Sequence, residues 1–182
     1  MNAKNHAVVQ RVFSVALMML LLWVLYPYCK YYWDADTTAY LSLTKYFSEG
    51  NYWEGMSSLW NPLHAFLAGL WLSVFGGTAY DALLITNIIG ASWVIVTSIG
   101  LFNHWVSTKW IQWLHVLFLG LFWAINAYFQ LTSDVFGVLG LNIFLLILLK
   151  NIKLDNWKYN ILLGVVLAFS ALAKTYSFYI GV

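Results

Sequence analysis

The chain has 182 residues, of which 62% are apolar, 19% are aromatic and only 9% are charged. Soluble domains carry roughly a quarter of their residues charged, so this composition excludes a soluble globular protein and favours one embedded in lipid. The net charge of +2 comes without a basic cluster interleaved with aromatic residues, which excludes a nucleic-acid-binding surface.

The first apolar segment follows Lys4 and Arg11 and contains no charge over residues 12–29. A helix of this length crosses a hydrocarbon core of about 30 Å. No small-residue cleavage site follows the segment, so we expect an uncleaved signal anchor that forms the first membrane span.

A polar and aromatic loop is predicted over residues 30–78, with a first surface helix over residues 36–49. Asp36 can cap the start of this helix, and Gly50 can end it. The apolar residues that recur at helical spacing are Tyr40, Leu43 and Phe47. We therefore expect an amphipathic helix that lies on the membrane surface.

A second apolar stretch, residues 62–76, is short for a span and opens with a proline. It can either cross the membrane or lie at the interface. If it does not cross, only Lys30 and Lys45 lie outside, with Lys174 inside the membrane near that face, and the cytosolic side collects six basic residues. These six are Lys4, Arg11, Lys109, Lys150, Lys153 and Lys158. If it crosses, this distribution reverses, so the positive-inside rule favours a surface helix.

Further uncharged stretches predict spans over about residues 82–103, 110–129, 135–149 and 159–180. The predicted fold is an all-α, polytopic transmembrane bundle of about five spans with two juxtamembrane helices on the outer face. Residues 1–182 form a single transmembrane module in this interpretation. The chain stops within an apolar segment, so we expect it to be incomplete at the C-terminus.

Asp134 and Lys174 are the two ionisable residues expected at membrane depth, where such groups are costly and therefore candidates for function. Each lies sixteen residues from a cytosolic lysine, Lys150 and Lys158 respectively, which places both roughly 24 Å above the inner boundary. Three other interpretations remain open: Asp134 as a helix N-cap, Lys174 snorkelling to the interface, or the two paired with each other.

Asp34 and Asp36 follow the first span directly, at the outer membrane surface. A carboxylate there can act as general base towards an acceptor hydroxyl, or the pair can share a divalent cation. The alternative is a helix cap for Asp36 and a solvated loop charge for Asp34. No other cofactor is predicted.

Among the four histidines no two stand at helical metal-ligand spacing, and His64 is the only one near the candidate site. A buried core ring is the simpler interpretation of His64. Trp60 lies in the outer loop, where its ring can stack on a sugar or belong to the interfacial aromatic belt.

Four stretches resemble, in order and spacing, the N-terminal part of the GT-C glycosyltransferases, which include protein O-mannosyltransferases and the aminoarabinose transferase of lipid A. The first is Asp-Thr-Thr-Ala-Tyr-Leu at residues 36–41, running on to Gly50, which is similar to the acidic motif after the first helix of that family. The others are the proline-led stretch at residues 60–76, the aspartate stretch at residues 131–136 and the lysine stretch at residues 171–176.

The resemblance implies that Asp36 is the catalytic base or orients the acceptor, that Lys174 holds the lipid phosphate, and that Asp134 supports the site. Members often carry a second acid directly after the first; Thr37 stands there in this chain, and Asp34 is the nearest substitute. Tyr40, His64 and Trp60 fall within the matching stretches and are expected at the substrate.

The function expected from this resemblance is transfer of a sugar from a polyprenyl-phosphate carrier to an acceptor hydroxyl on a glycan, lipid or protein. We expect a multi-pass protein of a bacterial inner membrane, with a cytosolic N-terminus and the active face outward. A transporter or channel subunit, with Asp134 and Lys174 lining a pathway, and a non-catalytic membrane assembly protein are the alternatives.

Overall fold

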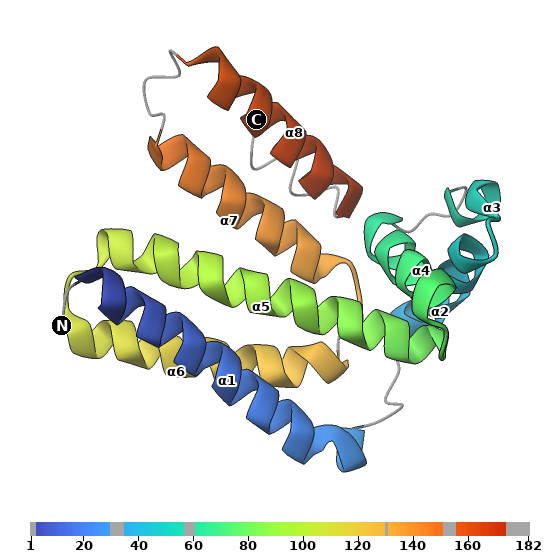
Figure 1. The fold of residues 1–182 in the computed structure, drawn as a ribbon, viewed down its shortest axis with the longest axis horizontal. Helices are drawn as coiled ribbons and strands as arrows, with labels where there is room; N and C mark the ends of the chain where they lie inside the picture. The colour runs from blue at the N-terminus through green and yellow to red at the C-terminus, as the bar shows by residue number, and fades with distance from the viewer. Residues whose placement is uncertain (1–2, 30–34, 57–60, 130, 151–155, 174–182) are drawn as a thin grey trace.

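The computed structural model describes residues 3–29, 35–56, 61–129, 131–150 and 156–173, and within these ranges the regular structure is entirely α-helical (Figure 1). The helices are α1 (Ala3–Cys29), α2 (Ala35–Ser48), α3 (Tyr52–Met56), α4 (Leu63–Phe75), α5 (Ala79–Trp105), α6 (Lys109–Phe129), α7 (Asp134–Lys150) and α8 (Trp157–Ala173). The predicted all-α class is therefore confirmed for the described part of the chain.

Three of the described helices, α1, α5 and α6, are long and apolar enough to cross a membrane. α7 and α8 contain 17 residues each, and α4 contains 13. At 1.5 Å per residue α4 is only about 20 Å long, which is short of a hydrocarbon core of about 30 Å.

The helix bounds extend the predicted apolar segments by a few residues at most ends. The largest difference is in α1, which begins at Ala3 and includes Arg11, whereas the first span was predicted from residue 12. An uncharged stretch shows which part of a helix lipid can surround. It does not show where the helix begins, because a helix can continue into charged residues. The helix α3 was not predicted, and residues 174–180 of the last predicted span lie outside the described residues.

The long helices run side by side and define two ends of the bundle (Figure 1). The start of α1, the turn between α5 and α6, the end of α7 and the start of α8 lie at one end, here called the basal end. At the other end, the cap end, α2, α3 and α4 lie beside the start of α5. The basic residues Arg11, Lys109, Lys150 and Lys158 belong to the basal end, and α2 to α4 form the cap.

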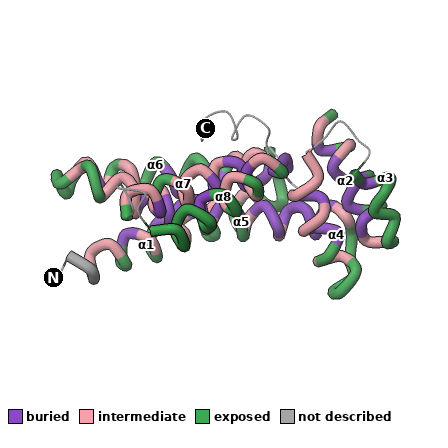
Figure 2. Tube along the Cα trace, turned by 90° about the horizontal axis from the view of Figure 1, so that it is seen from above, coloured by how far each residue is buried: buried purple, intermediate pink, exposed green. Residues whose placement is uncertain are grey.

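Small residues let the long helices approach closely. Gly120 of α6 faces the backbone of Ser14 in α1, and the Ser14 hydroxyl donates to the Val116 carbonyl at 2.8 Å. A Cβ on Gly140 of α7 would overlap the side chain of Ser170 in α8. Such glycine contacts are typical of helices that pack in lipid. Much of α5, at the centre of the bundle, is buried (Figure 2).

The cap packs on the bundle through the face of α2 that the sequence predicted. Its apolar residues are buried against α4 and the start of α5, and they are Tyr40, Leu43 and Phe47. α2 and α4 cross at Gly69, where an added Cβ would lie 2.5 Å from Phe47 Cβ and 3.0 Å from the Thr44 carbonyl oxygen. Gly50 ends α2 as predicted, with a φ of 78°.

Candidate functional site

The cap and the bundle are joined by a hydrogen bond between Tyr40 of α2 and Ser133, which directly precedes α7. The two hydroxyl oxygens lie 2.7 Å apart, and both side chains are buried. Breaking this bond would leave two buried hydroxyls without partners, and each would then cost its desolvation energy. This bond holds the start of α2 close to the start of α7.

His64 of α4 lies behind this bond and is fully buried. Its ring centre lies 5.8 Å from that of Tyr40 and 5.5 Å from that of Phe136, the latter in α7. Neither ring nitrogen has a partner with hydrogen-bond geometry among the described residues, although the backbone of Leu83 lies near enough to interact with the ring. His64 thus connects α2, α4 and α7.

Burial lowers the pKa of His64 to about 4. Loss of water around the charged form is the main cause, and the Leu83 backbone and the Asp134 carboxylate act in the opposite direction. His64 is therefore neutral near pH 7. A neutral imidazole cannot neutralise a phosphate. If His64 contacts the substrate as predicted, it can do so only through a hydrogen bond or ring packing.

Asp134 is the first residue of α7 and is half-buried. The Ser133 carbonyl accepts from the backbone N–H of Phe136 at 3.1 Å and of Gly137 at 3.2 Å, so Ser133, not Asp134, holds the N-cap position. The Thr132 hydroxyl donates to an oxygen of the Asp134 carboxylate at 3.0 Å. The carboxylate therefore sits at the positive end of the α7 dipole, in the first turn.

Asp36 lies in the first turn of α2 and is half-buried. The helix begins at Ala35, so the interpretation of Asp36 as the cap residue is wrong by at least one position. Tyr40 is the fourth residue after Asp36, a spacing that places the two on one face of α2. The face that carries Asp36 is the one that meets the start of α7 through the Tyr40–Ser133 bond.

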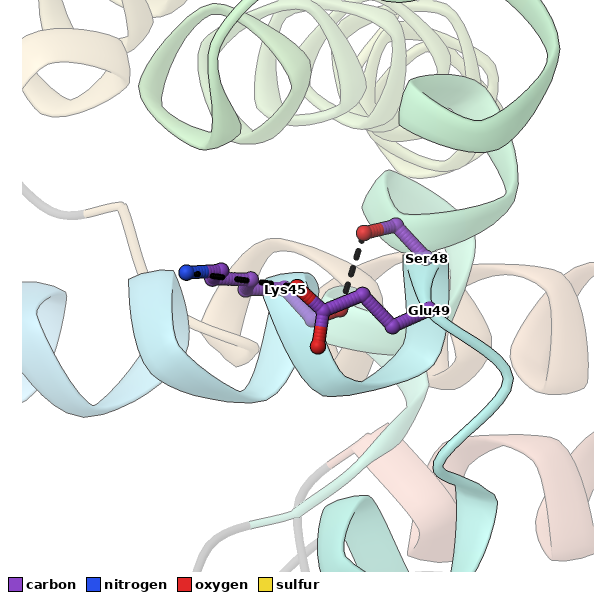
Figure 3. Close-up of polar contacts among 3 residues, drawn as sticks. All are labelled: Lys45, Ser48 and Glu49. Carbon is purple, nitrogen blue, oxygen red and sulfur yellow. Dashed lines mark hydrogen bonds and ion pairs between the residues drawn. The ribbon is translucent and has the colours of Figure 1, made fainter.

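The charges at the end of α2 and just after it lie apart from this face. Lys45 and Glu49 form an exposed ion pair at 3.9 Å, and the Ser48 hydroxyl donates to the Lys45 carbonyl at 2.8 Å (Figure 3). With 71% and 48% of their side chains exposed, these two residues interact mainly with water and with each other. They belong to the surface of the cap and not to the site.

An apolar groove of about 320 Å³ runs between α5, α6 and α7 and reaches Asp134. Its wall includes the apolar residues Val94, Trp123 and Val138 and the polar residues Ser98, Asn126 and Asp134. The groove is open on one side. It offers room for a hydrocarbon chain with a polar group near Asp134.

Three predicted site residues, Asp34, Trp60 and Lys174, lie outside the described residues. In the described ranges no three His, Cys, Asp or Glu side chains gather closely enough to hold a metal ion. Of the two residues predicted to share a cation, the structure describes Asp36, whereas Asp34 lies outside the described residues. Tyr40, His64 and Asp134 are brought to one cluster, and Asp36 lies on the same face of α2 as Tyr40.

Sequence reasoning did not single out Ser133 or Thr132 as parts of the site. Ser133 binds Tyr40 across 93 residues of chain, and no local pattern marks such a pair. The only signal was the run of three polar residues at the start of an apolar helix, Thr-Ser-Asp at residues 132–134. No protein-family description, characterised protein or solved structure matches the chain.

Proposed function

We propose that this chain is a membrane module of a glycosyltransferase that takes a sugar from a polyprenyl-phosphate carrier at the cap end. The observation that carries the proposal is the placement of the Asp134 carboxylate. It stands at the edge of an apolar groove and next to the Ser133 hydroxyl that binds Tyr40 of the cap. A lipid-linked substrate needs such a place, where a hydrocarbon chain and a polar reaction centre meet. The four sequence stretches that resemble GT-C enzymes point to the same chemistry.

The proposed reaction exchanges one bond at the sugar. The bond between the anomeric carbon and the carrier phosphate oxygen breaks, and a bond from that carbon to the acceptor oxygen forms. The acceptor proton passes to the carboxylate of Asp36, with Asp34 as the second candidate, and the polyprenyl phosphate leaves with the bonding electrons. Lys174 has the role of neutralising the charge that grows on the departing phosphate. A divalent cation held by Asp34 and Asp36 is the alternative way to orient the acceptor.

The proposed topology has five spans, the N-terminus in the cytosol and the cap end outside, as in a bacterial inner membrane. The distribution of basic residues supports it, because five of the six described basic residues belong to the basal end and only Lys45 belongs to the cap. All five described acidic residues belong to the cap or to its junction with the bundle, but acidic residues have little influence on topology. The acidic residues are Asp36, Glu49, Glu54, Asp81 and Asp134.

The proposal is tested in the full-length protein by replacing Asp36 with Asn and Lys174 with Ala. Release of polyprenyl phosphate from polyprenyl-phosphate sugars, with an acceptor glycan present, is measured in proteoliposomes. We expect each variant to lose activity by a factor of about 100 or more, which is the usual effect of removing a general base for Asp36 and of removing a transition-state electrostatic contact for Lys174. The matched control is Glu49→Gln, which removes an exposed acid just after the same helix and should leave activity unchanged.

Near-normal release in Asp36→Asn or Lys174→Ala would contradict the assigned roles. Correct insertion without binding of polyprenyl phosphate by the unmodified protein would reject the enzyme and favour a non-catalytic assembly protein. Movement of the carrier across the membrane without cleavage would favour a transporter.

A further inference from the structure

The hydrogen bond between Tyr40 and Ser133 lies beside the carboxylates on which the proposed function depends. Asp134 follows Ser133 directly and is the first residue of α7. Asp36 precedes Tyr40 by four residues, roughly 6 Å along the axis of α2. The bond therefore connects the helix start that carries one carboxylate to the helix start that carries the other.

The two halves of α2 are held by contacts of different kinds. In the second half, Thr44 and Phe47 meet Gly69 of α4 in a close packing contact. In the first half, Tyr40 belongs to the apolar cluster of the cap and also binds Ser133, with 2.7 Å between the two oxygens. Packing contacts have no preferred direction, whereas a hydrogen bond requires a short distance and a suitable angle. The bond therefore sets the place of the first half of α2 relative to α7 more narrowly than packing does.

The bonded pair is closed off from water. Tyr40 is 1% exposed and Ser133 is 0% exposed, and the His64 ring packs on both Tyr40 of α2 and Phe136 of α7. A buried hydroxyl that loses its partner cannot replace it with bulk water, so the bond favours one arrangement of the two helices. The start of α2 and the start of α7 thus have a defined relative position.

Burial also separates Tyr40 from the place where a carrier lipid would bind. The groove that reaches Asp134 is lined by residues of α5, α6 and α7, whereas the Tyr40 ring belongs to the apolar cluster of the cap. The family resemblance predicts Tyr40 at the substrate, but in the structure its hydroxyl binds Ser133. A side chain placed in this way acts on the reaction through the carboxylates that it positions.

We propose that Tyr40 and Ser133 are positioning residues for the glycosyl transfer, an inference that rests on the proposed function. Their hydrogen bond sets the place of Asp36, which takes the acceptor proton, relative to Asp134 at the edge of the carrier groove. The reacting atoms have to approach to about 3–3.5 Å, and a displacement of about 1 Å can lower the rate about 100-fold. Loss of the bond should therefore slow the transfer while the groove still binds the carrier.

The test measures polyprenyl phosphate release by the full-length protein in proteoliposomes. Undecaprenyl-phosphate hexoses and oligosaccharide acceptors are screened with the unmodified protein, and the pair that gives the fastest release is used for the variants. We expect Tyr40→Phe and Ser133→Ala each to lower kcat about 10- to 100-fold while KM for the carrier changes less than about twofold. The double variant should be no slower than the slower single variant, because either change alone abolishes the bond. The free energy of unfolding of each variant shows whether the measured kcat belongs to folded protein.

Thr44→Val is the matched control on the same helix. Thr44 lies one turn after Tyr40 and is fully buried, and its hydroxyl has no hydrogen-bond partner among the described residues. The substitution removes a buried hydroxyl at nearly the same side-chain size without breaking a described hydrogen bond. We expect kcat and KM to keep the values of the unmodified protein.

The outcomes separate this inference from the proposed function. Absence of release by the unmodified protein with every donor and acceptor would overturn the proposed function, and this inference with it. Release by the unmodified protein with an equal kcat in Tyr40→Phe and Ser133→Ala would overturn the positioning role alone. A higher KM with an unchanged kcat would show that Tyr40 or Ser133 binds the substrate directly. A loss of kcat in Thr44→Val as large as in Tyr40→Phe would assign the effect to the cap core in general and overturn the role of the bond.

Discussion

The two ends of the bundle bury different kinds of polar group. At the cap end the buried hydroxyls of Tyr40 and Ser133 bind each other, and the one fully buried imidazole, His64, is kept neutral. At the basal end Gln10 and Arg11 bring donors into the helix contact that the described residues do not satisfy. Each end therefore buries polar atoms without a described hydrogen-bond partner, but those of the cap belong to the uncharged side chains of His64 and Thr44, whereas the basal end includes the charged Arg11.

This difference follows from which helices each end brings together. The cap is built from three short helices that fold back on the bundle, so α2 and α4 supply partners for the start of α7. At the basal end, Gln10 and Arg11 of α1 instead meet α5, at Asn103 and Gly100 respectively. The polar groups of the cap are thus enclosed by several helices, whereas Arg11 rests against one helix.

Acidification should remove the difference by placing a cation in the cap, and this is the largest effect that we expect. The pKa of His64 falls from 6.5 to about 4 on folding, so the unfolded chain binds more protons between these values. The contribution of the neutral His64 ring to the free energy of unfolding is therefore largest above pH 6.5. It decreases by about 3 kcal/mol in total as the pH falls towards 4. The free energy of unfolding in detergent, measured from pH 7 to pH 4, checks this.

The control for this prediction is His64→Phe, which keeps an aromatic ring and has no group to protonate. Its stability should change less over the same pH range, with the remaining slope due to carboxylates. Equal slopes in the two proteins would show that His64 does not stay neutral in the cap.

Disturbing the contact between α2 and α4 inside the cap should have the second largest effect. Gly69→Ala puts a methyl group against Phe47 Cβ and the Thr44 backbone, and backbone atoms cannot move aside as a flexible side chain can. We expect a loss of about 1–3 kcal/mol, as for other overpacked contacts. Gly164→Ala in α8 is the control, because nothing lies within 4 Å of its added Cβ. The control should stabilise the helix by about 0.5–1 kcal/mol. An equal loss of unfolding free energy in the two variants would contradict the prediction.

Breaking the joint between cap and bundle should have a smaller effect. Tyr40→Phe and Ser133→Ala each remove one side of the 2.7 Å hydrogen bond, and each should reduce the free energy of unfolding by about 1 kcal/mol. The two losses should not add in the double variant, because either change alone abolishes the bond. Additive losses in this double-mutant cycle would show that the hydroxyls do not bind each other.

The smallest effect is expected on the cap surface. Lys45→Ala removes one member of the exposed pair with Glu49, and surface pairs one helical turn apart contribute about 0.3–0.5 kcal/mol. The loss should vanish at high salt, where exposed charges are screened. A larger, salt-independent loss would mean that Lys45 has a partner inside the cap.

Local patterns predicted much of the fold correctly, because they depend on residues close together in the chain. The spacing of Tyr40, Leu43 and Phe47 identified the buried face of α2, and Gly50 identified its end. The same patterns misplaced Asp36 at the cap of α2, and the cap position that they left open for Asp134 is held by Ser133. Aspartate favours a cap and the first helical turn for the same electrostatic reason, so sequence spacing could not separate the two positions.

Composition and apolar length by themselves determined that the chain is helical in the described ranges and rich in segments able to cross a membrane. Hydrophobic burial is a property of each segment, so a sequence can show it without knowledge of the neighbours. Only the tertiary structure decided that Tyr40 binds Ser133, that His64 is neutral, and that Arg11 lies against Gly100. Hydrogen bonds, desolvation and close helix contacts depend on which atoms meet across long stretches of chain, and that choice is made when the helices pack.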